Sequence, residues 1–214
     1  MKKLPIFIFL VIMLSVVFVS AEENLILKIE TNRLESAMNT IRNSAFVLYF
    51  KLGNLYFRNG NVDDAIRLFE KVGILNPNFA MAHHNLGVVY YSQNRTDKAI
   101  EEFKRAIEID KEYAKAHYSI ALVYYKSGEY SSAIDELEEV IRIEPDNANA
   151  QFDLAVSYAD RFRYRNGNAD NLANAESHFI KADNIMPGFP HARENAMVIR
   201  GIMEDEESLN NNFI

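Results

Sequence analysis

His83 and His117 are the residues of this chain whose type and spacing come nearest to reactive chemistry. Neutral imidazole binds zinc and other metals, and histidine transfers protons near neutral pH. The two residues lie 34 positions apart, which is also the period of a repeat in this sequence, so we expect them on neighbouring helices. A metal centre needs three or four ligands, and the sequence offers no third ligand near them. We therefore predict neither a metal nor a cofactor.

Adjacent acidic residues are the next candidates, because paired carboxylates can transfer protons in catalysis. They occur as Asp63-Asp64, Glu101-Glu102 and Glu138-Glu139. Neighbouring residues on a helix point in different directions, so we interpret these pairs as solvated faces. The chain has no phosphate-binding glycine loop, dinucleotide-binding motif, nucleophile elbow, zinc-protease motif or cysteine. The sequence therefore predicts a protein that is not an enzyme.

A 34-residue repeat organises most of the chain. Small residues and tyrosines recur at fixed places in four copies: Gly53, Gly87, Ala121 and Ala155; Tyr56, Tyr90, Tyr124 and Tyr158; Ala65, Ala99, Ala133 and Ala175. Such small residues allow two helices to approach closely. The pattern predicts helix pairs of constant length that stack along the chain.

The pattern resembles the tetratricopeptide repeat, a helix–turn–helix unit of about 34 residues. The resemblance implies an all-α, right-handed solenoid in which each repeat supplies a helix A and a helix B. We predict four repeats over residues 46–79, 80–113, 114–147 and 148–189, followed by a capping helix with a polar outer face over residues 190–203. The acidic and asparagine-rich residues 204–214 are predicted to be disordered.

The fourth repeat matches only after an insertion of eight residues. We expect its helix A to continue to about Arg165 and its helix B to start near Asp170, so that each helix gains about one turn. Residues Arg161 to Arg165 form a basic and aromatic cluster, which is either a contact for an anion or partner, or a solvated helix end whose arginines favour the negative end of the helix dipole.

The N-terminal residues 1–21 have the pattern of an export signal. Lys2 and Lys3 precede the uncharged stretch from Leu4 to Val19, and small residues follow at a possible cleavage point. The alternative is an uncleaved membrane anchor over residues 4–21. We expect a periplasmic or extracellular protein, or one anchored to a membrane. The net charge of −7 is unfavourable for nucleic acid as a partner.

Residues 22–45 form a leading amphipathic helix, in which Leu34, Met38, Ile41 and Ala45 are spaced four, three and four apart. One interpretation is that this helix covers the open end of the first repeat, and this is the prediction that we adopt. The other is a short coiled-coil segment that joins copies of the protein.

In the family that the chain resembles, the A helices form a concave wall that binds peptides. By repeat position, we predict the peptide-binding groove to be lined by Phe50, Asn54, Phe57, His84, Asn85, Val88, Tyr91, Lys115, Tyr118, Leu122, Tyr125 and Phe152. Aromatic anchors and amides suit an extended or helical peptide. The alternative is that many of these rings pack against the adjacent A helix.

Some members of the family bind a C-terminal carboxylate through a clamp of two lysines, two asparagines and an arginine. Asn54, Asn85 and Lys115 match three of these positions, but Phe50 and Ser119 replace a lysine and the arginine. We therefore do not expect a carboxylate clamp. The resemblance implies an exported adaptor or scaffold that binds a segment of another protein, for example in cell-envelope assembly. The alternative is a scaffold that self-associates, or is anchored, through its N-terminal helix and solenoid ends.

Overall fold

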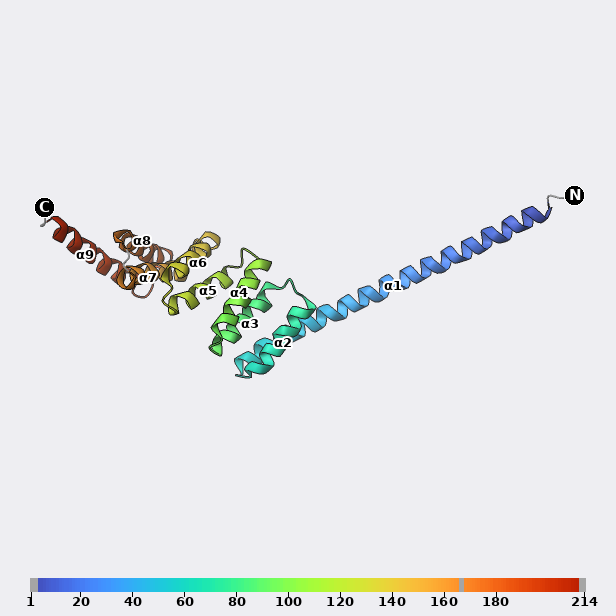
Figure 1. The fold of residues 1–214 in the computed structure, drawn as a ribbon, viewed down its shortest axis with the longest axis horizontal. Helices are drawn as coiled ribbons and strands as arrows, with labels where there is room; N and C mark the ends of the chain where they lie inside the picture. The colour runs from blue at the N-terminus through green and yellow to red at the C-terminus, as the bar shows by residue number, and fades with distance from the viewer. Residues whose placement is uncertain (1–3, 166–167, 212–214) are drawn as a thin grey trace.

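The chain folds into an elongated array of helices (Figure 1). The computed structural model describes the backbone of residues 4–165 and 168–211 and the side chains of residues 24–165 and 168–205. The helices are α1 (Leu4–Arg58), α2 (Val62–Leu75), α3 (Ala80–Ser92), α4 (Thr96–Ile109), α5 (Ala114–Lys126), α6 (Tyr130–Ile143), α7 (Ala148–Tyr164), α8 (Ala169–Ile185) and α9 (Ala192–Asn211). The prediction of an all-α helical-repeat solenoid is confirmed.

Each repeat is a helical hairpin that packs on the next one. The A helices are the C-terminal part of α1, then α3, α5 and α7, and each contacts the B helix that follows it, as well as the neighbouring repeat. Gly87 shows why the small positions are needed: a Cβ atom there would lie 2.6 Å from the ring of Phe103. The buried rings of Phe69, Phe103 and Phe179 therefore fill the space that the small residues leave.

The turns between helices A and B of the first three repeats share one backbone conformation. Gly60, Asn94 and Gly128, which occupy the same position in successive repeats, have φ values of +80°, +59° and +75°. Glycine adopts this left-handed conformation without strain, and asparagine is among the residues that tolerate it best. The B helices also end at equivalent places, two residues before Pro77, Lys111 and Pro145. Proline is therefore not needed to stop the helix in the second repeat.

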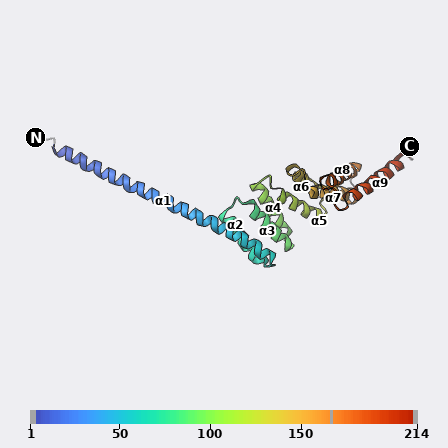
Figure 2. The ribbon, with the colours of Figure 1, turned by 180° about the vertical axis from the view of Figure 1, so that it is seen from behind.

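The leading helix does not cover the first repeat, and that prediction is wrong. Helix α1 runs without a break into helix A of the first repeat and projects from the end of the array (Figures 1 and 2). All described side chains from Asn24 to Ser44 are exposed. Residues 22–45 contain neither glycine nor proline, so nothing ends the helix and lets the chain fold back.

The fourth repeat has the longer helices that its insertion predicts. Helices α7 and α8 each span 17 residues, whereas α5 spans 13 and α6 spans 14. The extra residues of the two helices match, so the hairpin stays paired and its own buried cluster forms around Leu172 and Phe179. The predicted turn partly lies outside the described residues.

Helix α9 packs on α8 and buries Ala196 and Ile199 there. Its outer face is less polar than expected, because Met197 and Val198 are 58% and 62% exposed. The helix continues to Asn211, into the residues 204–214 for which the sequence predicts disorder. That stretch has no glycine or proline to end a helix already started by packing. Residues 212–214 lie outside the described part.

Among the residues whose side chains are described, no helix is both long and apolar enough to cross a membrane. The export signal or anchor predicted over residues 1–21 precedes that part of the chain.

Candidate peptide-binding groove

The predicted wall of the groove is built from one position that recurs in each A helix. Phe50, His84, Tyr118 and Phe152 occupy this equivalent position in the four repeats. In three repeats, this ring lies between an aromatic ring of its own B helix and a second ring just before the next A helix. We call these arrangements ring clusters: they are Phe50 with Phe69 and Phe79, His84 with Phe103 and Tyr113, and Phe152 with Phe179 and Phe189, at centroid distances of 5.1 to 6.0 Å.

The third repeat lacks such a ring cluster. Leu137 and Asn147 stand at the two places where the other repeats carry rings beside the A-helix residue, here Tyr118. Asn147 instead caps helix α7, because its side-chain oxygen accepts a hydrogen bond of 3.0 Å from the Ala150 amide. A hollow of about 300 Å³ opens there. This groove hollow is lined by His84, Ala114, Lys115, Tyr118, Ser119, Val140, Glu144 and Asn147.

Hydrogen bonds join neighbouring A helices along the same wall. The Asn85 amide donates to Asn54 Oδ1 at 2.9 Å, and His84 Nε2 lies 3.0 Å from Ser119 Oγ. Further along, the Tyr118 hydroxyl donates to Asp153. The Tyr125 hydroxyl donates to Asp160 at 2.6 Å. These bonds orient the polar side chains of the wall before any partner arrives.

Burial governs the ionisation of this wall. It raises the pKa of Tyr118 and Tyr125, and the carboxylates that accept their hydrogen bonds raise it further. Burial also lowers the pKa of His84, against a smaller opposing effect of its contact with Asn85. The tyrosines therefore stay neutral, and the groove hollow has Lys115 and Glu144 as its charged side chains.

The twelve predicted groove residues divide into two groups in the structure. Lys115 and Leu122 are exposed, and His84 and Tyr118 border the groove hollow. Phe50 and Phe152, in contrast, mainly pack within their ring clusters, and Tyr91 lies under the Lys126 ammonium group at 5.4 Å. Asn54 and Asn85 bond to each other, and the Tyr125 hydroxyl bonds to Asp160. Phe57 and Val88 pack against the core. The open part of the wall is therefore centred on the third repeat.

His83 and His117 bind separate partners and do not form a shared site. The His83 ring donates to Glu102 at 2.8 Å, and the His117 ring donates to Glu136 at 2.7 Å, each within its own repeat. Glu102 is only 8% exposed, so interpreting it as part of a solvated face was wrong. Within the described part of the chain, no group of three or more potential ligands that could hold a metal occurs.

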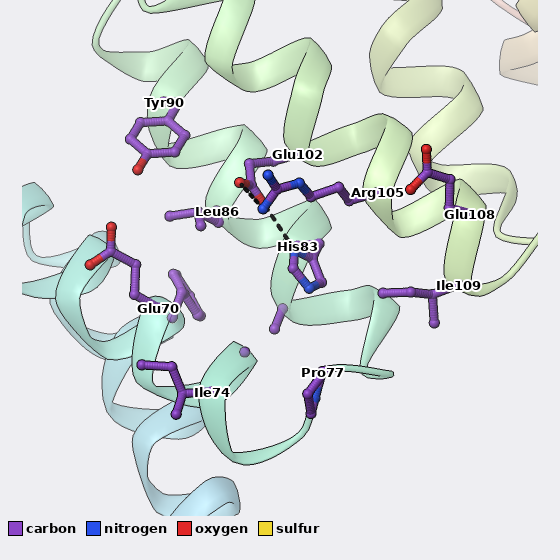
Figure 3. A pocket seen from close by; sticks show the side chains of 13 residues that line it. Glu70, Ile74, Pro77, His83, Leu86, Tyr90, Glu102, Arg105, Glu108 and Ile109 are labelled. Atoms are coloured by element: carbon purple, nitrogen blue, oxygen red, sulfur yellow. Dashed lines mark hydrogen bonds and ion pairs between the residues drawn. The ribbon is translucent and has the colours of Figure 1, made fainter.

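A second, larger hollow lies between α2, α3 and α4, away from the groove hollow (Figure 3). It has a volume of about 660 Å³, and His83, Glu102 and Arg105 lie on one side of it, with Ile74 and Pro77 on another. Sequence reasoning missed this hollow. The signal was Gly73, which stands where the next two repeats carry Ile107 and Ile141. The missing side chain leaves the space open.

The basic cluster of the fourth repeat packs back on the third one. The ring of Tyr164 stacks on Tyr130 at 6.2 Å, and the Arg165 guanidinium donates to the Gly128 carbonyl at 3.3 Å. Phe162 packs against the core of the fourth repeat. These contacts explain the aromatic residues and Arg165 without a ligand, whereas Arg163 remains exposed.

Comparison with known proteins agrees with this architecture. A family model described as TPR repeat matches residues 53–94, 89–128 and 121–160. The structure is similar to a crystal structure of MamA, with 28% identity over 65% of this chain and 77% of that one and a TM-score of 0.58. A second MamA structure has 25% identity, covers 76% and 86% of the two chains and gives a TM-score of 0.63. YrrB, described as a TPR protein with an unusual peptide-binding site, has 22% identity over 74% and 78%, with a TM-score of 0.61. No curated protein matches the chain.

Proposed function

Because the chain belongs to the tetratricopeptide-repeat family, we propose that it is an exported adaptor that holds a segment of another protein against its A-helix wall. The repeats indicate a protein-interaction scaffold. Peptide binding is supported by YrrB, a structural neighbour described as having a peptide-binding site. Export is supported by the signal pattern of residues 1–21.

The groove hollow is the observation that carries this proposal. It interrupts a line of ring clusters at the one repeat where both neighbouring rings are missing. An aromatic side chain of a partner would complete the cluster beside Tyr118, where ring contacts add to the burial of apolar area. Lys115 at the rim would pair with a carboxylate of the same segment, and Glu144 with a basic group. We therefore propose a peptide with an aromatic anchor and flanking charges.

The first test is photo-crosslinking in native cells from Lys115 and Leu122, two exposed positions on the predicted wall. Glu101, whose side chain is 59% exposed on α4, is the outer control. We expect one distinct partner captured from both wall positions and absent from the control. Adducts that form only with other copies of the chain would contradict the adaptor function and favour a self-associating scaffold.

Two variants then locate the binding site. Asn147→Tyr places in the groove hollow the ring that the second repeat carries at Tyr113, and Gly73→Ile fills the second hollow with the residue found at Ile107. We expect Asn147→Tyr to abolish capture and Gly73→Ile to preserve it. Loss of the Asn147 cap costs about 1 kcal/mol, so circular dichroism must show that both variants are folded. The reverse pattern of capture would move the binding site to the second hollow.

A further inference from the structure

Residues 24–44 of α1, which precede the first repeat and which we call the free half of α1, present apolar side chains that no other part of the described chain covers. Leu27, Leu34 and Ile41 are 60%, 64% and 69% exposed, and Leu48, at the edge of the first repeat, is 55% exposed. Both views show this half of α1 standing apart from the other helices (Figures 1 and 2). Exposed apolar surface of this extent indicates a contact that one copy of the chain does not make by itself.

The exposed residues follow a seven-residue period, which differs from the period of the repeats. Leu27, Leu34, Ile41 and Leu48 occupy one heptad position, d, and Thr31, Met38 and Ala45 occupy the companion position, a. From Asn32 to Asn43, the positions on the far side of the helix are all polar: Asn32, Arg33, Ser36, Asn39, Thr40 and Asn43. Outside this stretch, Ile29 and Val47 are exposed apolar residues on the far side. A narrow apolar stripe with this spacing is the seam of a coiled coil, which needs a second helix with a matching stripe.

Charges beside the stripe decide how a second copy would lie. In a parallel pair, Glu30 of each copy would face Glu35 of the other, and like charges would repel. In an antiparallel pair with Met38 opposite Ile41 of the second copy, Glu35 faces Arg42 and Glu30 faces Lys51. Both contacts are attractive, and the two-fold axis makes each of them twice. Within the described residues, no ion pair within the chain engages any of these four side chains.

Shifting the antiparallel pair by one heptad removes this complementarity. A shift in one direction places Glu35 opposite Glu35 and Lys28 opposite Arg42, and a shift in the other places Arg42 opposite Arg42. The favoured register also puts Leu34 opposite Ala45 and Thr31 opposite Leu48, so that the layers from Thr31 to Leu48 each pair a large side chain with a smaller one or with methionine. One register is therefore preferred by both charge and size.

We propose that two copies of the chain associate through an antiparallel coiled coil of residues 27–51, with Met38 of each copy packed against Ile41 of the other. This surface is separate from the groove hollow, so the proposal does not depend on the adaptor function. The two N-termini point in opposite directions in this dimer. Perpendicular anchoring of both copies in one membrane is incompatible with that geometry, so the dimer requires residues 1–21 to be removed.

Disulfide trapping tests the register directly, because the chain contains no cysteine of its own. Thr31→Cys and Leu48→Cys variants of the chain are mixed in equal amounts and oxidised. We expect a disulfide between the two different variants and none within either variant alone. Disulfides within each variant alone would demonstrate a parallel pair, and the absence of any disulfide in a dimer would exclude this interface. Either result would overturn the proposal.

A second experiment tests the stripe itself by analytical ultracentrifugation. Ile41→Asp places a charge in the seam, whereas Asn43→Asp adds the same charge on the far side of the same helix. We expect Ile41→Asp to weaken dimerisation by at least about 100-fold because the charge would be buried, and Asn43→Asp to leave it unchanged. A charge exchange, Glu35→Arg combined with Arg42→Glu, should restore the dimer that either single change weakens. A chain that stays monomeric at about 100 μM, a concentration well above the dissociation constant of a typical specific dimer, would refute the proposal.

Discussion

The free half of α1 and the helix A that follows it belong to one unbroken helix but are stabilised in different ways. Residues 45–58 pack as helix A of the first repeat, where Gly53 is buried and a Cβ atom on it would meet Phe69 at 2.9 Å. Residues 24–44 are exposed throughout and depend on the hydrogen bonds of their own backbone. The two segments also differ in sequence period. Residues 45–58, which pack within the chain, follow the period of the repeats, whereas residues 24–44, for which we propose a second helix as partner, follow a heptad period. A helix can therefore be continuous in structure while its two segments are suited to pack against different partners.

Removing a buried ring should give the largest difference between the repeats and the free half of α1. Phe103 is 2% exposed and fills the space beside Gly87, so Phe103→Ala should destabilise the chain by about 3–5 kcal/mol. Ile41→Ala removes an exposed side chain and should change stability by less than about 0.5 kcal/mol. Denaturant unfolding followed by circular dichroism, at a protein concentration that keeps the chain monomeric, measures both values. Equal losses would mean that the free half packs on the repeats in solution.

Filling a close helix contact should have a smaller effect. In Gly87→Ala, the new methyl group meets the Phe103 ring at 2.6 Å and the Ala99 carbonyl at 3.1 Å. Overpacking costs about 1–3 kcal/mol and exceeds the gain of about 1 kcal/mol from better helix propensity, so we expect a net loss on the order of 1 kcal/mol.

Gly201→Ala is the matched control for that variant. No atom lies within 4 Å of a Cβ built on Gly201. Only the propensity gain remains, so thermal unfolding should show an unchanged or slightly more stable chain. If both glycine variants lost the same stability, close packing would not be the reason for glycine in the repeats.

Acid should weaken the repeats by an amount no larger than that of Gly87→Ala. Burial, with a smaller contribution from Lys181, lowers the pKa of His178 to about 4, and its ring donates to Gln151 at 2.7 Å. Between pH 6.5 and pH 4, the unfolded chain binds a proton there that the folded chain does not, so stability falls as the pH falls through this window. Because the ring is partly exposed, we expect a loss on the order of 1 kcal/mol.

The readout is the difference between the native chain and His178→Gln, since other groups also titrate in this range. The variant should lose less stability than the native chain between pH 7 and pH 4.5 in thermal unfolding. The free half of α1 contains no histidine, so its helicity should not contribute to that difference. An identical pH response of the two proteins would rule out His178 as the source.

The 34-residue period was sufficient to predict the helical hairpins, because small residues and turn residues occupy equivalent places in successive copies. The lengthened α7 and α8 followed from counting eight extra residues. Side-chain contacts between the two helices of a repeat could not be counted in this way. Glu102 accepts a hydrogen bond from His83, 19 residues away, because of the way helices A and B are rotated about their own axes. The period of the sequence does not reveal this rotation.

Departures from the repeat carried more information about the candidate sites than the repeat itself. Asn147 and Gly73 each stand where other copies carry a larger side chain, and a hollow opens beside each of them. The sequence contains both signals, but their meaning depends on which side chains surround the missing group. The prediction that the leading helix covers the first repeat failed for a different reason. An amphipathic stripe indicates that a helix packs against an apolar surface, but it does not identify the molecule that carries this surface.

The unbroken path from the free half of α1 into the first repeat fixes an angle as well as a distance. A helix turns by about 100° per residue and rises about 1.5 Å, so the direction in which the groove faces is set by the number of residues between the apolar stripe and Gly53. Inserting two residues near Ser44 would turn the groove by about 200° relative to the stripe, whereas inserting seven would return it to within about 20°. The number of residues in this segment thus fixes the rotation angle between the apolar stripe and the groove.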